Sequence, residues 1–198
     1  MVACRVIDPL PPAHQAAAQA ETLGHLVAEA MAFLRRQPGA VLDLPAADGA
    51  RAFFGLGGND AAASLAAAAE AALALARHLQ EEASLLAAAG RPAPKFGVGL
   101  SSGMLSAGLL GRAEAPCFTA FGPPAEQSRQ LASLNARHGT CVLAGRRAAQ
   151  LGRDRFEFRA IEGDSLHELT GARPVETHDD PLVGSGDLDL HDSPPARG

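Results

Sequence analysis

The sequence predicts an α+β sandwich, in which helices cover a face of one antiparallel-rich sheet. Short apolar segments alternate with helical segments, and several of the short segments are paired across turns, which favours hairpins over a doubly wound parallel sheet. At 198 residues, the chain is long enough for one domain with its own core. Its composition is 47% hydrophobic with eight Phe and no Trp or Tyr, so Ala, Leu and Val must build most of that core.

The first half of the chain predicts three strands and two helices. Both helical segments have apolar residues at intervals of three and four, and they end at Gly39 and Gly90. Asp48-Gly49 favours a tight hairpin turn between two short strands. Asn59 or Asp60 can cap the second helix, which is rich in Ala and Leu. In order, these elements are a strand at 2–7, a helix at 16–36, strands at 41–44 and 50–54, and a helix at 61–89.

The second half of the chain predicts strands separated by glycines, a helix that begins with prolines, and a final hairpin. Prolines are tolerated in the first turn of a helix, and His138-Gly139 ends this one. From about Ala172, Pro, Gly, Asp and His dominate without periodicity, which predicts a disordered acidic tail at 172–198 after a domain at 1–171. The predicted elements are strands at 96–101, 104–109 and 117–121, a helix at 124–137, a strand at 140–143, a helix at 146–151, and strands at 156–160 and 165–169.

Several motifs occur together in an informative order. Residues 42–55 (LDLPAADGARAFFG) combine an Asp at a hairpin turn with an Ala-x-Phe-Gly end, and an Ala-rich helix follows. Residues 97–103 (GVGLSSG) and 108–111 (GLLG) are Gly-rich, and residues 118–122 (FTAFG) precede a helix. In this order the motifs resemble the catalytic domain of the class III nucleotidyl cyclases, the adenylyl and guanylyl cyclases, over about residues 1–171. The resemblance implies the ferredoxin-like cyclase sandwich and an activity that converts a purine nucleoside triphosphate to a cyclic nucleotide.

The resemblance also implies a metal site. In this family two carboxylates bind two metal ions, Mg²⁺ or Mn²⁺, which activate the ribose 3′-hydroxyl and hold the triphosphate. Asp48 falls on the second of these positions, and Asp8 is the candidate for the first. The segment after Asp8 is Pro9-Leu10-Pro11-Pro12, and its three prolines remove backbone donors that the family's loop offers to phosphate. A hairpin turn explains Asp48 and a strand end explains Asp8 without any metal.

Other polar positions of the family carry different residues in this chain. The family reads the purine with a Lys and with an Asp or Thr, and it steadies the ribose and the transition-state charge with an Asn and an Arg. Leu44 replaces the Lys, Glu126 the Asn and Gln130 the Arg, whereas Thr119 keeps a hydroxyl, which strand packing also explains. Arg129 lies about 100° around the helix from the Arg position. Loss of a fixed cation beside a developing phosphate charge typically costs several kcal/mol of barrier.

A serine hydrolase is a remote alternative. Residues 99–103, Gly-Leu-Ser-Ser-Gly, match the nucleophile elbow, with Ser101 as nucleophile and His167 as the available base. That elbow requires a helix directly after the serine, whereas residues 104–111 predict a strand.

Composition excludes several other functions. A net charge of −5 without a basic stripe argues against nucleic-acid binding. The three cysteines form no CxxC pair, the histidines form no HxH or HxxxH pair, and neither a signal peptide nor a membrane span is evident, so a cytoplasmic protein is expected.

The sequence therefore predicts a degenerate class III cyclase-like domain. We expect it to be catalytically inactive alone and to act in signalling as a regulatory or dimerisation module, which binds nucleotide weakly if at all. The expected partner is a second copy or another cyclase-like domain. The alternative is the carboxylate-donating half of a heterodimeric adenylyl or guanylyl cyclase. No cofactor is expected unless residual or heterodimeric cyclase activity exists, which would need Mg²⁺ or Mn²⁺.

Overall fold

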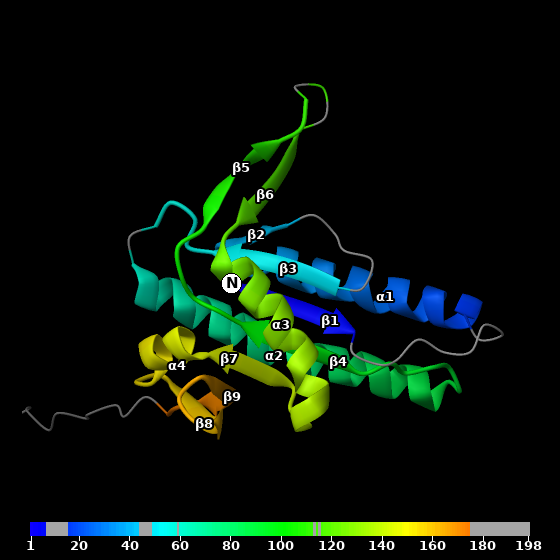
Figure 1. Cartoon of the computed structure of the whole chain (residues 1–198). Helices are drawn as coiled ribbons and strands as arrows, with labels where there is room; N and C mark the ends of the chain where they lie inside the picture. The colour runs from blue at the N-terminus through cyan, green and yellow to red at the C-terminus, as the bar shows by residue number, and fades with distance from the viewer. Residues whose placement is uncertain (7–15, 44–48, 59, 113, 115, 175–198) are drawn as a thin grey trace, which may run out of the picture.

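A computed structural model describes residues 1–6, 16–43, 49–58, 60–112, 114 and 116–174. Helices and short strands alternate along these ranges (Figure 1). The elements are β1 (Val2–Val6), α1 (Ala16–Arg35), β2 (Ala40–Leu42), β3 (Gly49–Phe54), α2 (Ala61–Ala88), β4 (Phe96–Leu100), β5 (Ser106–Leu110), β6 (Cys117–Phe121), α3 (Pro123–His138), β7 (Val142–Gly145), α4 (Arg146–Gly152), β8 (Phe156–Glu162) and β9 (Leu166–Ala172).

Within the described residues, most strands belong to one seven-stranded sheet in the order β2-β3-β1-β4-β7-β9-β8. Its neighbours are antiparallel except for β4 and β7, which run parallel. Strands β5 and β6 pair with each other in a separate two-stranded sheet. We call the hairpin formed by β5 and β6 the arm; Figure 1 shows these strands projecting from the rest of the domain.

Helices lie on both faces of the main sheet. Helices α1, α2 and α4 pack on one face, where the Ala- and Leu-rich α2 meets the inward side chains of the central strands. Helix α3 lies on the opposite face, across β1, β4 and β7 (Figure 1). Asp60 caps α2: its Oδ1 accepts hydrogen bonds from the N–H groups of Ala62 and Ala63, each at 2.9 Å.

Two glycines of β4 allow helix α3 to approach the sheet closely. A Cβ on Gly99 would lie 1.9 Å from the carbonyl oxygen of Ser128, and a Cβ on Gly97 would lie 2.2 Å from that of Ala132. The buried Asn135 then joins helix to strand, because its Nδ2 donates to the Val98 carbonyl at 3.0 Å. The Gly-x-Gly sequence of β4 therefore determines where α3 and its polar residues lie.

The predicted fold class is confirmed, with two differences. The helices occupy both faces of the sheet, since α3 packs opposite the others. Residues 104–111 do contain a strand, but β5 pairs only with β6 and so does not extend the main sheet. Element boundaries agree within two or three residues. No helix in the described ranges has the length and hydropathy needed to span a lipid bilayer.

Candidate functional site

The metal and purine positions proposed at Asp8, Leu44 and Asp48 lie outside the described residues. The strand ends that flank them are described. Strand β1 ends at Val6, β3 begins at Gly49, and Arg5 pairs with Gly49 in antiparallel register. The described chain therefore brings together the two strands on which the sequence places the carboxylates, and the carboxylates themselves stay predictions.

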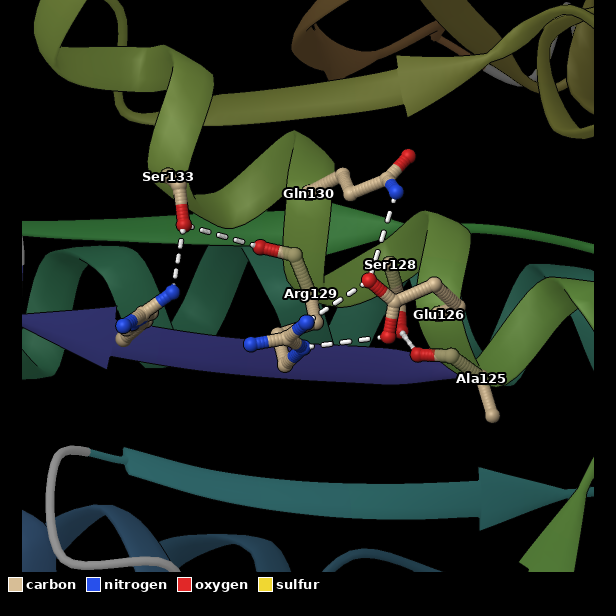
Figure 2. Close-up of polar contacts among 7 residues, drawn as sticks. Ala125, Glu126, Ser128, Arg129, Gln130 and Ser133 are labelled. Carbon is tan, nitrogen blue, oxygen red and sulfur yellow. Dashed lines mark hydrogen bonds and ion pairs between the residues drawn. The ribbon is translucent and has the colours of Figure 1, made fainter.

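The first turns of α3 bring Glu126, Arg129 and Gln130 together (Figure 2). Arg129 donates two hydrogen bonds to the carboxylate of Glu126, from Nη2 to Oε1 at 2.7 Å and from Nε to Oε2 at 3.1 Å. The Gln130 amide donates to the same Oε1 at 3.2 Å. Residues three and four apart share a face of a helix, so these contacts are local to α3. We call these three residues the α3 cluster.

Glu126 is an ionised carboxylate at neutral pH. The hydrogen bonds from Arg129, with smaller contributions from Gln130 and from the charge of Arg51, hold the pKa of Glu126 below its usual value. Both partners of the ion pair are about half exposed, at 52% for Glu126 and 50% for Arg129. Such an exposed pair contributes little to stability. The cluster therefore matters for the charge it presents to a ligand.

Two arginines that the sequence analysis did not single out also belong to this face. The Nη1 of Arg5, on β1, donates to Ser133 Oγ at 3.1 Å, and Ser133 Oγ donates to the Arg129 carbonyl at 3.1 Å. Arg51, on β3, is near enough for its charge to act on Glu126. A charged residue inside an otherwise apolar strand is the signal that could have identified both.

Arg51 also forms an ion pair with Asp43, which follows β2. The Asp43 side chain is fully buried and its Oδ2 meets the Nη2 of Arg51, whose side chain is 29% exposed. Oδ1 of Asp43 has no hydrogen-bond donor among the described residues. A buried carboxylate depends on its cation, so Arg51 is tied to Asp43 and supplies only part of its charge to the α3 face.

Thr119 lies in the arm, on the strand that precedes α3 in the chain. It belongs to β6, opposite Gly108 of β5, and is buried with 6% of its surface exposed. This position is consistent with packing in the hairpin, and its role toward a purine stays a prediction.

The context of a serine nucleophile is missing. Ser101 is fully buried and its hydroxyl donates to the Pro124 carbonyl at 2.7 Å. The next regular element is strand β5 rather than a helix, so the elbow geometry is absent from these described residues. The burial of Ser101 and the strand that follows it argue against the serine hydrolase alternative.

A metal site cannot be assembled from the described residues alone, since no group of three or more His, Cys, Asp or Glu side chains there could hold an ion.

The described part of α3 offers a carboxylate, an amide and a carboxylate-bound guanidinium. Chemically, this set can bind polar groups, but it lacks an uncommitted cation at the Arg position for phosphate.

Comparison with solved structures finds proteins whose fold is similar to that of this chain. No family model and no curated protein matches the sequence. The adenylyl cyclase CyaB from P. aeruginosa is similar in structure with a TM-score of 0.65 at 16% identity, over 87% of this chain and 93% of that one. The guanylate cyclase domain of RhGC from Catenaria anguillulae, in complex with GTP, gives 0.62 at 15% identity, over 87% and 96%. A non-canonical dimeric guanylyl cyclase domain of the RhoGC fusion protein from Blastocladiella emersonii gives a TM-score of 0.62 at 12% identity, over 87% of this chain and 95% of that one.

Proposed function

We propose that this chain, which has the fold of the class III cyclase catalytic domains, is catalytically inactive alone and acts in signalling as a dimerising, regulatory module. The observation that carries the proposal is the α3 cluster. Glu126 and Gln130 occupy the positions at which the cyclase resemblance implies Asn and Arg, and the neighbouring Arg129 is bound to Glu126 through two hydrogen bonds.

The charge of this cluster opposes triphosphate chemistry. A neutral Asn would steady the ribose, whereas the ionised Glu126 repels the phosphates. Gln130 carries no charge to meet the negative charge that develops in the transition state, a loss that costs several kcal/mol of barrier in comparable sites. Arg129 compensates only in part, because using its guanidinium for phosphate would leave the Glu126 carboxylate beside the ligand with the neutral Gln130 amide as its remaining donor.

The arm supports the dimerisation part of the proposal. All five residues of β5 are exposed, including Leu109 at 69% and Leu110 at 47%, and Phe121 at the end of β6 is 54% exposed. Phe118 of the arm packs against Phe53. The register places Leu110 and Phe121 on one face of the hairpin and Leu109 on the other, and exposed apolar side chains that share a face mark an interaction surface. A second copy of the chain that covers these side chains accounts for their exposure, and the RhoGC domain of similar fold is described as a non-canonical dimer.

A heterodimer is the second candidate. The substitutions fall on the purine-reading Lys and on the Asn and Arg positions, whereas Asp48 and Asp8 keep acidic residues at the metal positions. A chain with that pattern could supply carboxylates to a partner that supplies the rest.

Two measurements test these proposals. Sedimentation of the purified chain should show a dimer, and Leu110→Glu with Phe121→Glu should shift it to monomer by placing charge on one face of the arm. Leu85→Glu is the matched control, because Leu85 is 64% exposed on α2, away from the arm. Dimerisation through the arm would be contradicted by a monomer at all concentrations. It would also be contradicted if the arm variant and the Leu85→Glu control shifted the monomer–dimer equilibrium equally.

Cyclic nucleotide formation should be absent with ATP or GTP and Mg²⁺ or Mn²⁺. The chain should then be mixed with an active cyclase domain whose metal carboxylates are replaced by Ala. Product that appears only in the mixture, and disappears with Asp48→Ala, would establish the heterodimer in place of the inactive module.

A further inference from the structure

The hollow between α4 and the β8–β9 hairpin gathers cationic side chains from separate segments. It has a volume of about 270 Å³ and lies on the face of the sheet opposite α3. Arg146 and Arg153 line it from the start of α4 and from just after its end, and Arg173 lines it from just after β9. This local excess of positive charge contrasts with a chain whose net charge is −5.

The spacing along α4 explains why two of these arginines face the hollow. Residues 146, 149, 150 and 153 all line it, and intervals of three and four place them on one face of the helix. Arg147, one residue on, lines a different pocket near the start of α2. The backbone N–H of Arg173 donates to the Arg155 carbonyl at 2.8 Å, which anchors Arg173 beside β8.

These guanidinium groups are available to a ligand. Among the described residues, Arg146 and Arg173 have no carboxylate partner, and Arg153 meets only the exposed Asp154 at 3.6 Å. Asp164 also lines the hollow, yet within the described chain it forms no ion pair with any of the three arginines. Guanidinium forks bind phosphate through paired, charge-assisted hydrogen bonds, which makes phosphate the anion that this arrangement favours.

The remaining lining adds a polar atom and an apolar wall. His167 lines the hollow, and its buried Nδ1 has no hydrogen-bond partner in the described structure. Phe156 and Phe158 also line the hollow, and residues two apart in a strand share a face. Phe156 is fully buried and forms the floor, while Phe158 is partly exposed and can meet a ring or alkyl group.

We infer that this hollow binds a small phosphate monoester, with its phosphoryl group held by Arg146, Arg153 and Arg173 and its apolar or aromatic group against Phe158. The site does not depend on the proposed cyclase-like function, because it uses no residue of the α3 cluster or of the arm. It would allow a phosphorylated metabolite to act on the β8–β9 end of the sheet.

Titration calorimetry of the full chain tests this inference with phenyl phosphate, inorganic phosphate and phenol. We expect saturable binding of phenyl phosphate, weaker binding of inorganic phosphate, and none of phenol. Arg146→Gln and Arg173→Gln should each weaken the binding of phenyl phosphate about tenfold, the typical value of a charge-assisted pair. Arg147→Gln makes the same charge change on the same helix and should leave the affinity unchanged.

Two outcomes would overturn the inference. One is the absence of saturable phenyl phosphate binding by the correctly folded full chain. The other is an equal loss of affinity in Arg147→Gln and Arg146→Gln, which would reveal a diffuse response to charge. Circular dichroism of each variant, all of which change exposed arginines, confirms that the fold is kept.

Discussion

Replacement of Gly99 by Ala should force α3 away from β4. The new Cβ would lie 1.9 Å from the Ser128 carbonyl oxygen and 2.7 Å from the Ala132 nitrogen. Both are backbone atoms, so no side chain can rotate to make room, and α3 must retreat by roughly 1.5 Å to restore ordinary contact. Overpacking of this kind costs about 3 kcal/mol. A domain of this size loses about 2–4 °C of Tm per kcal/mol, so we expect a decrease of roughly 6–12 °C.

Thermal and urea unfolding, followed by circular dichroism, measure this change. Gly108→Ala is the matched control, because a Cβ at Gly108 meets nothing within 4 Å. It should leave the midpoint nearly unchanged. If Gly99→Ala and Gly108→Ala unfold alike, the glycines of β4 do not determine the position of α3, and the geometry derived for the α3 cluster loses its support.

The remaining predictions concern buried polar groups. Arg51→Leu should lower the free energy of unfolding by about 3 kcal/mol, because it leaves the Asp43 carboxylate buried without its cation. The double variant Arg51→Leu with Asp43→Leu should recover much of that loss, and urea unfolding measures both changes. Asn135→Leu should lower the free energy of unfolding by about 2–4 kcal/mol, because the Thr140 hydroxyl loses the Asn135 Oδ1 acceptor that lies 2.9 Å away. Thr140→Val should lower it by less. Burial lowers the pKa of the Met1 amine from 8.0 to about 5. In a chain that begins at Met1, the unfolded state therefore binds more protons at this amine than the folded state does between pH 5 and pH 8. The free energy of unfolding should therefore decrease as the pH falls from 8 to 5, and N-terminal acetylation should remove that part of the slope.

Local sequence signals were sufficient for most of the elements. Helical spacing and glycine stops predicted α1 and α2, and the Asp-Gly dipeptide predicted the pairing of β2 with β3, which the register of Leu42 opposite Ala52 confirms. The Gly-x-Gly of β4 is one of the motifs on which the cyclase resemblance rests, and its contact with α3 gives a physical reason for these glycines.

Features that depend on distant contacts could not be predicted in the same way. The arm has the sequence of an ordinary hairpin, and only the three-dimensional arrangement separates it from the main sheet. Asp43 is not distinguishable from an exposed loop carboxylate until Arg51 is seen beside it. The pairing of Arg129 with Glu126 was accessible from their three-residue spacing, whereas the placement of Arg5 against Ser133 required β1 and α3 to be neighbours.

The most direct test of the account is the cyclase assay on the purified chain alone. With ATP or GTP, and with Mg²⁺ or Mn²⁺, over the protein concentrations at which sedimentation tests the proposed dimer, we expect no cyclic nucleotide above a heat-denatured control. Cyclic AMP or cyclic GMP produced by the chain alone would show that Glu126 and Gln130 are compatible with catalysis and would contradict the account.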